Sequence, residues 1–224
     1  MPLKISEVGK LLKTFNKFQT IEFNTSLPVK IEVKEKLTDI KYLIQMGKKE
    51  VITKSFVPLK KGKYFAMVKE IGNTLKISNL KPFPKIALLL DKIKFKEENN
   101  FITKEHILNH LSNAANKEEF LFFTNILIAL QQKKIYHLII NEKKKALLQY
   151  KYSKNRLKFY AVFNNLGEIE GEIYNNNLDI YSPYKNTLEL IEKHSNLIDL
   201  NVNTFLKETK PLYEFQNSLL NLKA

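Results

Sequence analysis

Between residues 27 and 80, apolar and polar positions alternate in five short runs. In the first run, Val29, Ile31 and Val33 are separated by charged residues, which is the pattern of a half-buried strand. Gly47 and Gly72 stand at turns between later runs. The other four runs are residues 40–46, 50–57, 64–71 and 74–80. Five short strands at this spacing predict a small closed or nearly closed β-barrel, preceded by an amphipathic helix.

The pattern changes after residue 98, where two helical periodicities come first. Thr103 is a candidate N-cap for one helix. The next helix is expected from Lys117 to Gln132 and is apolar around most of its circumference. A further helix begins near Pro183, and strand patterns occupy residues 135–140, 146–152, 157–163, 168–174, 178–182 and 200–206. This order predicts an α+β fold in which a mixed sheet has helices packed on one face.

Charge and proline positions indicate where the two parts meet. Residues 1–98 hold 21 lysines against 10 acidic residues, a net charge of +11, whereas residues 99–224 have a net charge of +3. Pro82 and Pro84 end the first periodic region, and residues 94–100 form a polar connector. We therefore predict two domains, residues 1–98 and residues 99–224.

The net charge of +14 favours attraction to polyanions but not specific base recognition. Of the 37 basic residues, 36 are lysine and one is Arg156. Specific recognition of guanine or phosphate usually uses the bidentate guanidinium group of arginine, which lysine lacks. Non-specific nucleic-acid binding by a lysine-rich β-barrel is the alternative function, with Phe56, Tyr64 and Phe65 as candidate stacking aromatics. The abundance of Lys, Asn and Ile is also what an AT-rich genome produces.

No group of residues has the spacing that catalysis or metal binding requires. The chain has no cysteine, which excludes disulfides and thiolate chemistry. His106 and His110 are four residues apart, but Ile107 occupies the position of a metalloprotease carboxylate and no third ligand is evident. We therefore expect a protein that is not an enzyme and that uses no cofactor and no metal.

Residues 157–206 carry a more specific pattern. An alternating strand is followed by a Leu166-Gly167 corner, a second alternating strand, a short turn, a third strand, a leucine-bearing helix and a final strand. This order resembles the C-terminal domain of bacterial flagellar hook-length control proteins, and the strands of residues 40–80 resemble more weakly a β-module upstream in some of them. The family often has a proline before the corner, where this chain has Asn164-Asn165. The family's long Gln-, Ser- or Pro-rich region is missing, so a ruler, a switch and a chaperone-like role all remain open.

The resemblance implies a protein that acts by contact with flagellar partners. It would dock on the cytosolic part of the type III export gate, or on hook-assembly proteins, and regulate substrate switching or hook assembly. The candidate contact residues are Leu166, Gly167, Glu168, Glu170 and Glu172, because glycine allows close backbone approach and exposed carboxylates complement a basic surface. No window of about 18 uncharged apolar residues occurs. We expect a cytoplasmic protein without membrane insertion, and export through the flagellar type III pathway stays open.

Overall fold

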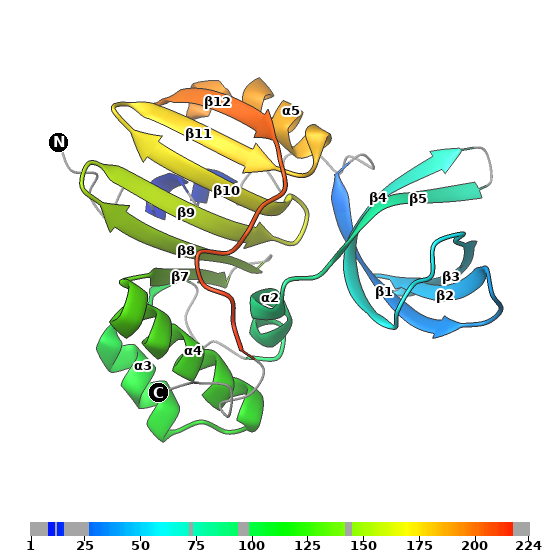
Figure 1. Ribbon diagram of the computed structural model, residues 1–224, viewed down its shortest axis with the longest axis horizontal. Helices are drawn as coiled ribbons and strands as arrows, with labels where there is room; N and C mark the ends of the chain where they lie inside the picture. The colour runs from blue at the N-terminus through cyan, green and yellow to red at the C-terminus, as the bar shows by residue number, and fades with distance from the viewer. Residues whose placement is uncertain are drawn as a thin grey trace.

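The computed structural model describes residues 9–11, 13–15, 27–71, 74–93, 99–141 and 145–216. The chain forms an α+β structure with two separate sheets, one of five strands and one of seven (Figure 1). Most strands agree with the alternation in the sequence, because a period of two places every second side chain on the same face. The expected N-terminal amphipathic helix lies largely outside the described residues, of which 9–11 and 13–15 are helical.

The first sheet consists of antiparallel strands in the order β3-β2-β1-β4-β5. After three consecutive strands, the fourth returns to lie beside the first, which is a Greek-key order. The strands are β1 (Pro28–Lys36), β2 (Lys41–Met46), β3 (Lys49–Lys54), β4 (Gly62–Ile71) and β5 (Thr74–Pro82).

The prediction of a closed barrel is wrong for the part of the chain that the structure describes, because β3 and β5 stay apart as the two ends of an open sheet. Closure would require β3 to bury the face that continues the buried Tyr42 and Ile44 of β2, yet Val51 and Thr53 on that face are only partly buried. On β4, Phe65 packs against Phe83 and Tyr184, and so joins the core of the second part of the chain.

The second sheet has the order β12-β11-β10-β9-β8-β7-β6. All neighbouring strands are antiparallel except β11 and β12, which are parallel and are connected through helix α5 (Lys185–Lys193) and a short 3-10 turn, η1 (Ser195–Leu197). The strands are β6 (Asn99–Phe101), β7 (Tyr136–Asn141), β8 (Lys145–Ser153), β9 (Arg156–Phe163), β10 (Gly167–Tyr174), β11 (Asn177–Ser182) and β12 (Asn201–Leu206). β6 begins within the stretch that the sequence predicts as a polar connector.

Helices cover both faces of the second sheet, which corrects the prediction of helices on one face only. On one face, Leu188 and Ile191 of α5 pack with Phe159, and Phe15 from the start of the chain joins them. The opposite face is covered by α2 (Lys85–Leu90) and α4 (Lys117–Lys133), with α3 (Lys104–Ser112) packed on α4. The physical reason is that residues 146–150 of β8 are buried without interruption, so this strand needs cover on both sides.

The chain passes from the first sheet to the second between β5 and β6, and α2 lies on this connection. The sequence pattern predicts no helix there, and α2 has only six residues. Its Ile86 and Leu90 are buried in the core formed by α4 and the second sheet. Residues before 98 therefore contribute directly to the core of the second part.

The longest helix of the described residues, α4, has 17 residues. None of the helices in the described part of the chain combines the length and apolarity needed to cross a lipid bilayer.

Candidate functional site

A row of side chains crosses the second sheet at a single register. Strand pairing aligns His137 with Gln149, Gln149 with Tyr160 and Tyr160 with Glu170. Tyr181 on β11 continues the row beyond Glu170. In a regular sheet, residues directly opposite each other point to the same face. The face in question is the one covered by α2 and α4, since Tyr160 belongs to their core.

Residues 207–216, here called the C-terminal strap, lie across this row (Figure 1, red). The strap forms no helix or strand. Its main chain donates from Lys207 N to Ser182 O at 3.0 Å and from Lys210 N to an oxygen of Glu170 at 3.3 Å. At Tyr213 it exchanges two hydrogen bonds with the Gln149 amide, at 3.1 and 2.9 Å. The strap is thus attached to strands β11, β10 and β8 in turn.

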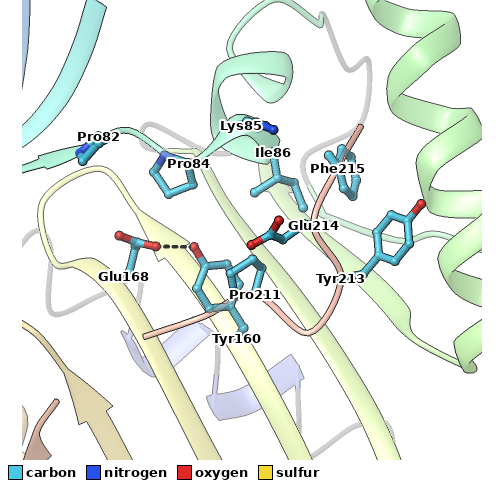
Figure 2. A pocket seen from close by; sticks show the side chains of 10 residues that line it. All are labelled: Pro82, Pro84, Lys85, Ile86, Tyr160, Glu168, Pro211, Tyr213, Glu214 and Phe215. Atoms are coloured by element: carbon cyan, nitrogen blue, oxygen red, sulfur yellow. Dashed lines mark hydrogen bonds between the residues drawn. The ribbon is translucent and has the colours of Figure 1, made fainter. Parts of the chain in front are cut away.

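A pocket with a volume of about 180 Å³ opens between the strap, the start of α2 and strands β9 and β10 (Figure 2). Its wall combines prolines, aromatic rings, two carboxylates and one lysine. The lining residues are Pro82, Pro84, Lys85, Ile86, Tyr160, Glu168, Pro211, Tyr213, Glu214 and Phe215.

Glu168 and Tyr160 form a hydrogen-bonded pair in this pocket. The Tyr160 hydroxyl donates to Glu168 Oε1 at 2.6 Å (Figure 2). Burial raises the pKa of Glu168 above its ordinary value, while the Tyr160 hydrogen bond and the charge of Lys81 oppose the rise. Burial, and then the charge of Glu168, raise the pKa of Tyr160 well above its ordinary value. The pair can therefore hold one proton on the phenol and accept another on the carboxylate.

We predict that Tyr160→Phe raises the pKa of Glu168 further. The hydroxyl hydrogen bond favours the ionised carboxylate, so its removal leaves burial less opposed. Carbon-detected NMR of the Glu168 carboxyl during a pH titration measures the change. Tyr174→Phe is the matched control, because the Tyr174 hydroxyl bonds to Asp179 and not to Glu168. A downward or absent shift in Tyr160→Phe would contradict the prediction.

The Leu166-Gly167 corner lies in the interior. Leu166 is completely buried, and its carbonyl accepts a hydrogen bond from the Thr187 hydroxyl at 2.9 Å. Gly167 has a φ of +72°, and a Cβ placed there would lie 2.5 Å from the ring of Tyr184. Glycine does permit a close approach here, but the approaching group is a side chain of the same chain. Neither residue offers a side chain to a partner in this fold.

The three glutamates of β10 share one face, as the alternation predicts, but all are only partly exposed. Glu172 accepts from Arg156 at 3.0 Å and lies 3.9 Å from the ammonium of Lys158. Glu170 accepts from the strap and Glu168 from Tyr160. The expected open acidic face is therefore partly covered by internal partners.

The aromatics expected to form a stacking platform separate in the structure. Phe65 is fully buried, and Tyr64 is half-buried with its hydroxyl donating to Lys60 O at 2.8 Å. Phe56 is 87% exposed. One of the three thus remains available for stacking.

The two histidines at helical metal spacing also separate. His106 is exposed. His110 Nδ1 lies 3.2 Å from Glu119 Oε1, and the His110 ring stacks on the ring of Phe123. In the ranges that the structure describes, no cluster of three or more His, Cys, Asp and Glu side chains could hold a metal ion.

Sequence reasoning missed the polar residues that hold the strap. Gln149, His137 and Asn125 are buried polar side chains in apolar surroundings. Gln149 follows Leu147 and Leu148 in the sequence, and a lone amide inside an apolar strand is a signal that some polar group must face it. The sequence does not reveal that the facing group is the main chain near residue 213.

Comparison with known proteins gives no family: no protein-family model, no curated protein and no solved structure matches this chain.

Proposed function

We propose that this chain is a non-enzymatic protein-binding protein whose partner is the cytosolic part of the flagellar type III export gate, where it regulates substrate switching or hook assembly. One observation supports this proposal more than any other. The elements β9, β10, β11, α5 and β12 follow one another in the order that the resemblance to hook-length control proteins implies. The Leu166-Gly167 corner joins β9 to β10, as that order requires.

The accessible surface of this unit narrows the candidate contact residues. Leu166 and Gly167 are interior, so the proposed contact moves to Glu170 and Glu172, which keep an exposed part. The unit ends at β12, an edge strand where Phe205 and Leu206 are exposed. Exposed apolar side chains beside carboxylates suit a protein partner with a basic rim. The proposal places the chain in the cytosol, where that partner would be reached.

We predict that the double variant Glu170→Gln, Glu172→Gln weakens binding to the purified cytosolic domain of the export gate about tenfold, because two carboxylates facing a basic surface lose their charge. The glutamine at position 170 still offers an oxygen to Lys210 N, so the strap attachment is kept. Titration of the wild-type and variant chains against the labelled gate domain measures the effect.

The matched control is Glu105→Gln, Glu189→Gln, which removes two charges from exposed positions on α3 and α5. Equal affinity of both double variants would contradict the assigned contact, and no binding by the wild type would contradict the partner. A gel shift on single-stranded DNA and RNA in the same experiment tests the alternative function. Salt-sensitive binding that depends on Phe56 would favour nucleic acid over the gate.

A further inference from the structure

We propose that the surface beneath the C-terminal strap is a peptide-binding site for segments with an aromatic-x-aromatic sequence, and that the strap occupies it in cis. The external occupant would be such a segment of another protein. This inference is independent of the flagellar resemblance, since it rests on how residues 207–216 are held.

The strap is held through its backbone by side-chain amides. Gln149 Nε2 donates to Tyr213 O and Gln149 Oε1 accepts from Tyr213 N. Asn125 of α4 does the same at Gln216, with 2.7 Å to its N and 3.1 Å to its O. Beyond Lys207, which donates to Ser182 O, the strap crosses strands whose N–H and C=O groups are used in the sheet, so it finds its partners in side chains. Paired amide contacts of this kind recognise the backbone of a peptide and do not depend on its side chains.

The spacing of these contacts is within reach of one continuous segment that crosses neighbouring strands. Glu170 and Gln149 are two strands apart, or about 9.6 Å at the usual strand separation. The strap residues bound to them, Lys210 and Tyr213, are three positions apart, a stretch that spans at most about 10 Å, and the strap bends at Leu212 and Tyr213. The polar row across the sheet therefore serves as successive attachment points for one continuous segment.

Two aromatic side chains anchor the segment between these backbone contacts. Tyr213 and Phe215 are 7% and 1% exposed, whereas Glu214 between them is exposed. The centroid of the Phe215 ring lies 5.5 Å from the centroid of the Phe122 ring and 5.8 Å from that of the His137 ring. Main-chain hydrogen bonds that give affinity, together with pockets for alternate side chains that give specificity, are an established way of recognising a peptide segment. The site thus selects an aromatic residue, any residue, and a second aromatic residue.

The test uses the full chain with a protease cleavage site inserted between Lys207 and Glu208, which are both exposed. A tethered strap outcompetes a free peptide because its effective concentration is in the millimolar range, so the tether must be cut. After cleavage and gel filtration, a fluorescent peptide with the sequence of residues 208–217 is titrated and its anisotropy recorded. We expect saturable binding, and at least a hundredfold loss for a peptide carrying Tyr213→Ala and Phe215→Ala.

The matched control peptide carries Glu214→Ala and should bind within threefold of the parent peptide. On the protein side, Gln149→Ala and Asn125→Ala should each weaken binding at least tenfold, with the circular dichroism of the cleaved chain unchanged. Unfolding of the cleaved chain on loss of the fragment would overturn the proposal, because the strap would then be an integral part of the core. Exclusion of the peptide, or binding that ignores the two aromatics, would overturn it as well.

Discussion

Gly167→Ala should lower the free energy of unfolding by about 3 kcal/mol, as measured by urea denaturation. Two effects add. The φ of +72° costs a residue with a Cβ about 1–2 kcal/mol. The new methyl group would also lie 2.5 Å from Cε2 of Tyr184, a fully buried ring that cannot move aside without displacing its neighbours. Overpacking of this kind costs about 1–3 kcal/mol.

Gly47→Ala separates these two effects. Gly47 has a similar φ of +58°, but a Cβ added there would meet no atom within 4 Å, so alanine should cost only about 1 kcal/mol. In a second control, Gly167→Ala combined with Tyr184→Leu should destabilise less than the sum of the two single variants, since the clashing ring is gone. Equal losses for Gly167→Ala and Gly47→Ala would show that contact with Tyr184 contributes nothing.

Acidification from pH 7 to pH 5 should remove about 2 kcal/mol of stability through His137 alone. Burial lowers the pKa of His137 from 6.5 to about 3. Below pH 6.5 the unfolded chain therefore binds a proton that the folded chain does not bind. The stability contribution is complete above pH 6.5 and is lost progressively as the pH falls from 6.5 toward 3.

The hydrogen bonds around His137 also oppose a proton on Nε2. The backbone at Tyr213 fixes the orientation of the Gln149 amide, since its Oε1 accepts from the N–H and its Nε2 donates to the carbonyl. The same Nε2 lies 3.2 Å from Nε2 of His137, so that imidazole nitrogen must be the acceptor. A proton there would place two donors against each other at the strap.

Urea denaturation of His137→Gln at several pH values between 5 and 7 checks this prediction. Glutamine retains an acceptor oxygen and does not titrate, so the fall in stability over this interval should be about 2 kcal/mol smaller than in the wild type. His106→Gln is the matched control, because it removes an exposed histidine of α3. An unchanged dependence in His137→Gln would contradict the prediction.

The strap and the β10 acids also bear on the proposed partner contact. Glu170 binds the strap backbone, so displacement of the strap by an external segment would free its carboxylate. The export-gate titration and the peptide titration use different partners and different variants. One can therefore fail while the other succeeds.

Most of the local structure follows directly from the order of the amino acids. Alternation located the strands of both sheets except β6, as at β10, where Glu168, Glu170 and Glu172 share one face. Thr103 caps α3 as predicted, its hydroxyl accepting from His106 N at 3.2 Å. These features depend on residues that are close along the chain, so their spacing can be read without knowing the fold.

How those elements are covered and closed depends instead on tertiary packing. The pattern of β3 shows a strand but not that it would remain at an open edge. The apolar run of β8 shows burial but not that α4 and α5 would cover opposite faces. The corner at Gly167 shows backbone freedom but not that Tyr184 would fill the space. Gln149 and Tyr213 are 64 residues apart, and such a pairing depends on how the whole sheet packs, which no local pattern records.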